Sequence, residues 1–171
     1  MKKFELTTES ITFLGRTLFR IKALISFGNV KAGELGGYIE KEGNLSHEGN
    51  AWVCDNARVC GDARVCDNAR VYGDARVCGD ARVCDNAWVC GDAWVYGNAD
   101  IATISGFGSE YRTTTFFRTK NDEIAVKCGC FYGTLAEFRE KVKETNGDNR
   151  YAKEYLMIAD LMEMHFRGEE K

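Results

Sequence analysis

Between residues 51 and 104, hydrophobic and polar positions recur with a period of six residues. Valine returns once in every period, and alanine stands two residues before it: the valines are at 53, 59, 65, 71, 77, 83, 89 and 95. An α-helix, with about 3.6 residues per turn, would scatter these valines around its axis. In an extended strand, Ala-Arg-Val or Ala-Trp-Val places alanine and valine on one face and the larger residue on the other. The pattern therefore predicts short strands with a common apolar face.

Turn-forming residues follow each short strand, as Cys-Gly-Asp or Cys-Asp-Asn. Glycine, asparagine and aspartate tolerate left-handed backbone angles and are frequent in turns. We predict that three six-residue segments close one three-sided coil, and that successive coils stack as parallel strands about 4.8 Å apart. Residues 18 apart in the sequence should then lie on top of one another. The outward side chains should form three columns: Trp52, Arg70 and Trp88; Arg58, Arg76 and Trp94; and Arg64, Arg82 and Asp100.

The repeated V-C-G-D-A-R resembles the hexapeptide repeat of left-handed parallel β-helices, and this resemblance implies a left-handed coil. It extends back to IEKEGN from Ile39 and LSHEGN from Leu45, where larger residues replace alanine. Atypical terminal repeats are expected where a solenoid is capped. The chain also resembles hexapeptide-repeat proteins of bacteriophages and prophages, through GGYIEKEGNLSHEGNAWV, GFGSEYRTTTFF and CGCFYGTLAEF. That resemblance implies a viral or prophage origin and a compact C-terminal cap.

The flanking segments predict a cap on each side of the repeats. Strands are expected at residues 3–7, 11–14 and 17–23, and later at 113–119 and 123–127. Thr134 and Glu137 have the spacing of a capping box, which predicts a helix to about residue 145, and a second helix is expected over residues 149–166. We therefore predict a mainly β protein: an N-terminal β cap (1–38), a left-handed parallel β-helix (39–104) and a small α+β region (105–171).

Charge and hydropathy narrow the range of partners. The net charge is −3 and the isoelectric point is about 5.5, so no positive surplus indicates binding to a nucleic-acid polymer. No apolar run is long enough to cross a membrane, and no apolar segment of a signal peptide follows the first lysines. We expect a cytoplasmic protein, in the host cell if it is encoded by a phage.

Six of the eight cysteines occupy one position of the repeat, where Tyr72 and Tyr96 also occur. A position that accepts tyrosine is a packing position rather than a metal ligand. Cys128 and Cys130 form C-x-C, which in a strand places both thiols on one face. We predict structural thiols, with no metal and no cofactor. The stacking prediction brings two cysteine pairs within disulfide range, although a cytoplasm should keep them reduced: Cys60 with Cys78, and Cys66 with Cys84.

Three classes of function are compatible with these features. The first is an enzyme: the resemblance to hexapeptide β-helices implies an acyltransferase, because such helices frequently belong to trimeric acyltransferases that hold acyl-coenzyme A between subunits and use a histidine as general base. His47 is the histidine near the repeats. The coil lacks the extruded loop that shapes the site in those enzymes, so we expect a protein that is not an enzyme. The other two classes are a binding protein and a structural module of a virion or assembly.

For a binding protein, the sequence offers two kinds of surface. Outward tryptophans beside arginines can form cation–π contacts or meet other protomers, and a homo-oligomer, preferably a trimer, is expected. In SGFGSEYRTTT, two glycines allow close approach of the backbone, while hydroxyls and a guanidinium can bind phosphate. The alternative is a glycine turn that enters a strand of β-favouring threonines. We predict a small anionic, nucleotide-like ligand, such as a signal of host immunity, at Gly106, Gly108, Ser109, Arg112, Thr113 and Thr114.

Overall fold

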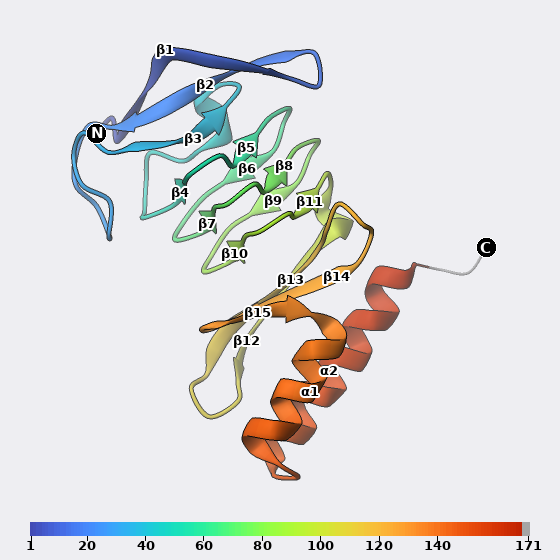
Figure 1. Ribbon diagram of the computed structural model, residues 1–171. Helices are drawn as coiled ribbons and strands as arrows, with labels where there is room; N and C mark the ends of the chain where they lie inside the picture. Colours follow the sequence, from blue (N-terminus) through green and yellow to red (C-terminus); the bar gives the residue numbers. More distant parts are fainter. Residues whose placement is uncertain (169–171) are drawn as a thin grey trace.

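The computed structural model describes residues 1–168 as a three-sided β-solenoid with a strand-rich cap at one end and a sheet with two helices at the other (Figure 1). The parallel registers join Trp52 to Arg70 and Arg70 to Trp88, so the predicted stacking of residues 18 apart is confirmed. The solenoid strands have two residues each: β4 (Trp52–Val53), β5 (Arg58–Val59), β6 (Arg64–Val65), β7 (Arg70–Val71), β8 (Arg76–Val77), β9 (Arg82–Val83), β10 (Trp88–Val89) and β11 (Trp94–Val95).

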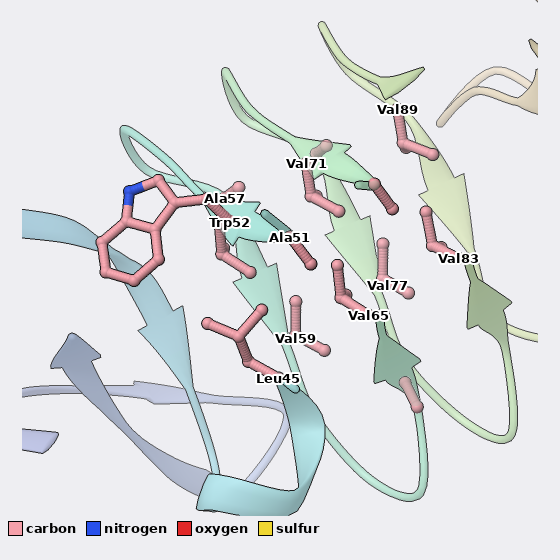
Figure 2. Packing of buried hydrophobic residues seen from close by; sticks show 14 of the residues in the cluster. Leu45, Ala51, Trp52, Ala57, Val59, Val65, Val71, Val77, Val83 and Val89 are labelled. Atoms are coloured by element: carbon pink, nitrogen blue, oxygen red, sulfur yellow. The ribbon is translucent and has the colours of Figure 1, made fainter. Parts of the chain in front are cut away.

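The repeat alanines and valines fill the interior of the solenoid. Every valine of the series is at most 1% exposed, and Figure 2 shows several of them directed toward a common interior. Each buried valine contributes about 1.5–3 kcal/mol relative to an exposed one. Three faces result from the strand pairing: β4-β7-β10, β5-β8-β11 and β6-β9.

The backbone conformation of the corners explains why either glycine or aspartate follows the cysteine position of the repeat. Asp55, Asp67 and Asp85 have φ between 51° and 58°, and the glycines at four of the equivalent corners also have positive φ. Each of these corners needs one residue in the left-handed region, which glycine adopts freely and aspartate tolerates. The two residues are therefore interchangeable for a conformational reason.

The N-terminal cap continues one face of the solenoid. Strand β1 (Phe4–Phe13) pairs antiparallel with β2 (Arg16–Ala23), and β2 with β3 (Leu35–Ile39), which runs parallel to β5. A short 3-10 helix, η1 (Glu42–Asn44), follows. The prediction of two strands within residues 3–14 is wrong, because one strand spans this segment and a register irregularity between Leu6 and Ser10 takes up the break in its pattern.

The C-terminal region begins at Ile101, before residue 104, where the six-residue repeat was predicted to end. After η2 (Asn98–Asp100), strand β12 (Ile101–Phe107) turns away from the parallel stack and pairs antiparallel with β13 (Arg112–Arg118). The sheet is completed by β14 (Ile124–Cys128) and β15 (Phe131–Thr134), so it has four strands rather than the two of the predicted hairpin. Helices α1 (Leu135–Asn146) and α2 (Arg150–Arg167) follow as expected, the first with the predicted capping box at Thr134 and Glu137.

Alternation along β13 and β14 gives this sheet two different partners. Phe117 and Ala125 belong to the core of the solenoid and close its end, whereas Phe116 and Val126 pack with the helices. Because successive side chains of a strand point to opposite faces, one sheet serves both cores. Asp100 accordingly leaves the third predicted column and forms an ion pair with Arg118, at 3.2 Å.

Candidate functional site

A groove of about 720 Å³ is lined by residues of the last coil, including Trp88 of β10, and of the C-terminal sheet, including Arg112 and Thr113 of β13. Figure 1 shows this junction of the solenoid with the sheet. The side chain of Trp88 contributes one wall and is 43% exposed. The backbone N–H of Trp88 donates to Thr115 Oγ1 at 3.0 Å, and the Tyr72 ring packs edge-on against the indole at 6.2 Å. The indole is therefore held in place while part of its surface faces the groove.

Two cations line the same groove. Lys127 is only 8% exposed, its Nζ lies 5.4 Å from the centre of the Trp88 ring, and it donates to the carbonyl of Gly129 at 2.5 Å. Arg112 contacts the carboxylate of Glu110 at 3.5 Å, and its side chain covers the backbone of Gly129, where an added Cβ would lie 2.4 Å from Nη1. Because the groove is lined by two cations and one carboxylate, its lining carries a net positive charge.

The rim of the groove adds an aromatic ring and a hydroxyl group. Tyr111 is 64% exposed and has a φ of 52°, which places it in the left-handed region at the tip of the β12–β13 connection. Thr113 lies half-buried in the groove wall, and its Oγ1 is 2.8 Å from Ser105 Oγ. Aromatic, cationic and hydroxyl groups thus converge within one concave surface, an arrangement that suits small ligands.

The structure separates the residues predicted from SGFGSEYRTTT. Arg112 and Thr113 line the groove, whereas Gly106 and Ser109 lie exposed on the strand end and connection beside it. Gly108 packs against Tyr155 of α2, whose hydroxyl would lie 2.2 Å from an added Cβ. The lack of a side chain at Gly108 therefore allows α2 to pack closely against this connection. Thr114 is 1% exposed and donates to Cys128 Sγ at 3.2 Å, on the helix side of the sheet.

Several groove residues were not predicted. Glu110 and Tyr111 lie within the segment SGFGSEYRTTT, but no pattern in that segment indicates that their side chains line the groove. Lys127 interrupts an otherwise apolar strand, on the same face as Ala125, and this cation in a buried strand was the available signal. Its meeting with Trp88, 39 residues earlier, depends on how the sheet docks on the solenoid.

His47 lies at the opposite end of the solenoid, after η1, where it contacts the N-terminal cap. Its Nδ1 accepts the backbone N–H of Lys3 at 3.1 Å, and its ring stacks on Phe4 with 4.3 Å between centroids. Its Nε2 is 3.8 Å from Glu42 Oε2. These contacts are those of a residue that fixes the cap.

The tryptophan–arginine columns are less exposed than the repeat pattern predicted. Trp52 lies in the predicted outward column, but it is fully buried because Phe4 and Phe27 of the cap contact its ring edge-on, so the expectation that it is exposed is wrong. The cap adds apolar residues above this column that the repeat alone does not contain. Arg70 lies in register between the two indoles, but the cation over Trp88 is Lys127.

The second column is covered in a similar way. The guanidinium groups of Arg58 and Arg76 each lie 5.1 Å from the ring centre of Phe13 in β1, and Arg76 also lies 4.9 Å from Trp94. All three column residues are half-buried. The protein's own N-terminal hairpin therefore occupies part of a surface that we expected to meet other protomers.

The cysteine pairs stack as predicted, with one difference in their oxidation state. Cys60 Sγ and Cys78 Sγ are 2.7 Å apart as free thiols, whereas Cys66 and Cys84 form a disulfide. The expectation that all thiols are reduced is thus wrong for one pair. Asp67 lies close to both of these sulfurs, but metal binding would need thiolates, which a disulfide lacks. Cys128 is half-buried and Cys130 is exposed at the groove.

A second hollow, of about 490 Å³, lies between β14 and the helices. Its three arginines are already paired: Arg118 with Asp100 and Asp122, Arg139 with Asp160 and Glu163, and Arg167 with Glu163. Because these charges are neutralised within the protein, the groove at Trp88 is the better candidate for an anionic ligand.

Comparison with known proteins supports the fold class. Residues 63–79 and 75–91 match a family model described as the YdcK beta solenoid repeat. No curated protein matches the chain. The match covers a small part of the sequence, so it identifies a β-solenoid repeat and assigns no activity. In the part of the chain that the structure describes, no helix is both long and apolar enough to span a membrane.

Proposed function

We propose that this protein binds a small planar anion of the nucleotide class in the groove at Trp88, without chemical turnover. The observation that carries the proposal is a partly exposed indole with a buried lysine at its face and an arginine on the same rim. An aromatic base can stack on the exposed part of the Trp88 ring, and stacking of this kind contributes about 1–3 kcal/mol per base. Arg112 and Lys127 are the groups that would bind its phosphate.

Capture is favoured over acyl transfer by the position of His47. The histidine that a hexapeptide acyltransferase would use as a base accepts a hydrogen bond from the cap backbone and stacks on Phe4. It also lies far from the groove, at the other end of the solenoid. The phage resemblance extends the proposal to a signalling nucleotide of host immunity, which the protein would sequester.

Isothermal calorimetry tests the proposal with AMP, ATP, cyclic mononucleotides, cyclic dinucleotides and inorganic phosphate. We expect at least one nucleotide to bind with a 1:1 ratio per chain, more weakly at high salt because the contacts are partly ionic. Quenching of tryptophan fluorescence should accompany binding. Trp88→Leu and Arg112→Gln should each weaken the affinity about tenfold or more, since each removes roughly 1.4 kcal/mol or more of binding free energy.

Trp94→Leu and Arg16→Gln are the matched controls, because they remove the same side-chain types away from the groove, on β11 and β2. They should leave the affinity unchanged. If no nucleotide binds, and mass spectrometry finds no small molecule released by heating the purified protein, the proposal is wrong. Equal loss in Trp88→Leu and Trp94→Leu would place the binding site elsewhere.

A further inference from the structure

Two cysteine pairs join the same two coils of the solenoid at neighbouring corners, and they differ in exposure. Cys60 and Cys78 are 2% and 3% exposed, and both remain free thiols. Cys66 and Cys84 are half-buried and disulfide-bonded, with Cα atoms 4.7 Å apart. Both pairs hold the same position of the repeat, so the difference arises from their surroundings.

The N-terminal cap covers one corner and leaves the other open. Cys60 and Cys78 pack with Leu18 and Tyr38, residues of the cap. Cys66 and Cys84 instead line a groove of about 470 Å³ on the β6–β9 face. A molecule in solution can therefore approach the disulfide, whereas the free pair lies under a hairpin.

Two arginines border the open corner. Arg64 and Arg82 are paired in register on β6 and β9, two residues before the cysteines, and both line the same groove. Both side chains are exposed. Glu42 lines the same groove, but its carboxylate is paired with Lys2 at 2.6 Å, and Asp62, whose charge acts on Arg64, is paired with Lys41 at 2.9 Å. Two stacked guanidinium groups therefore leave a surplus of positive charge that attracts anions and raises their local concentration.

We propose that the Cys66–Cys84 disulfide is a site of reversible thiol–disulfide exchange with small anionic thiols. The thiolate of the incoming molecule attacks Cys66 Sγ, the bond to Cys84 breaks, and its electron pair leaves on Cys84 Sγ. The carboxylate of Asp67 lies 3.2 Å from Cys66 Sγ and within 4.8 Å of Cys84 Sγ. At the shorter distance it disfavours negative charge more strongly on Cys66, so the thiolate is released at Cys84.

A second small thiolate completes the reaction. It attacks the sulfur of the first small molecule in the mixed disulfide and releases Cys66 as a thiolate. Two small thiols are thereby oxidised to one small disulfide, the protein disulfide gains two electrons, and the two protons of the small thiols pass to the cysteines. The reverse reaction, with the small disulfide as oxidant, restores the link between the coils.

Glutathione, a thiol of net negative charge, is the probe for this proposal. The folded protein is incubated with it, quenched with acid and alkylated, and peptides are analysed by mass spectrometry. We expect Cys66 and Cys84 to become reduced, with a transient glutathione adduct on Cys66, while Cys60 and Cys78 are modified only after denaturation. When the Cys84→Ser variant is treated with oxidised glutathione, a mixed disulfide of Cys66 with glutathione should accumulate. In the matched Cys78→Ser variant, Cys60 should stay unmodified under the same treatment.

A second experiment tests whether the positive charges of Arg64 and Arg82 accelerate the reaction with anionic thiols. In the Arg64→Gln/Arg82→Gln variant, the rate with glutathione should fall by roughly 3- to 10-fold, while the rate with cationic cysteamine should not fall. Arg150→Gln, on α2, should leave both rates unchanged. The proposal is overturned if Cys66 and Cys84 react no faster than the covered pair. It is also overturned if the double variant slows both thiols equally.

Discussion

At the scale of single residues, the cap contains a cation in an apolar environment. Lys3 is 1% exposed, and its Nζ donates to the carbonyl of Ala51 at 2.9 Å and lies 4.7 Å from the ring centre of Phe27. Burial, followed by the positive charge of Arg70, lowers the pKa of Lys3 from 10.5 to about 8. The carbonyl contacts do not fully offset the loss of water around the ammonium group.

This pKa predicts a pH dependence of stability. Between pH 8 and 10.5 the unfolded chain holds a proton on Lys3 that the folded chain has released, so the free energy of unfolding should rise with pH in this window. Below pH 8 both states are protonated and Lys3 adds no slope. The slope is at most about 1.4 kcal/mol per pH unit.

Urea denaturation of the wild type and of Lys3→Met across pH 7–11 measures this contribution. The difference between their unfolding free energies should change only within that window. Lys2→Met is the control, because Lys2 is exposed and should leave the wild-type pH profile unchanged. Parallel profiles for wild type and Lys3→Met would contradict the assignment.

At the scale of elements, the corners decide which substitutions the solenoid tolerates. Gly79 has a φ of 62°, and an added Cβ would lie 2.0 Å from the carbonyl oxygen of Tyr96 in the next coil. Gly97 holds the equivalent position one coil later, but its φ is −161° and its nearest neighbour, Asp80 Oδ1, is 3.3 Å from an added Cβ. The repeat pattern alone does not distinguish these two glycines.

Gly79→Ala should therefore destabilise the protein by at least about 1–2 kcal/mol, the cost of a left-handed non-glycine residue, before the clash with Tyr96 is added. Gly97→Ala should change the stability by no more than about 0.5 kcal/mol. Thermal denaturation followed by circular dichroism compares the two variants. Equal losses would show that η2 is as intolerant of a side chain as the corner at Gly79.

At the scale of the whole molecule, the C-terminal sheet both closes the solenoid and forms the groove. Phe117 is fully buried in the solenoid core, while two residues before it Thr115 accepts the N–H of Trp88. The half of the molecule that carries the arginine and lysine is thus fastened to the half that carries the indole. The trimer expected from the resemblance to acyltransferases stays a prediction, which sedimentation velocity measures.

Phe117→Ala should weaken this attachment. Truncation of a buried phenylalanine costs about 3–5 kcal/mol, and here we also expect a red shift of Trp88 fluorescence as the groove loosens. Phe116→Ala, a buried neighbour on the helix side, should cost a similar free energy without shifting that emission. An unchanged spectrum in a folded Phe117→Ala protein would show that the groove does not depend on the insertion of Phe117 into the solenoid core.

The sequence by itself determined the solenoid. A six-residue period, an inward alanine–valine pair and one left-handed corner in each segment are local properties, repeated until stacking at 18 residues is the arrangement that buries every valine. The same pattern predicted the stacked cysteines and the order of the two outward columns that contain tryptophan, and the capping box predicted the first helix.

Only the tertiary structure decided which of those columns remain exposed and where a ligand could bind. Trp52 is buried because a non-repetitive cap folds over it, and Lys127 reaches Trp88 because the C-terminal sheet docks on the last coil. These contacts join segments that share no periodicity, so their geometry depends on the fit between two surfaces. The difference between the covered and the open cysteine pairs has the same origin.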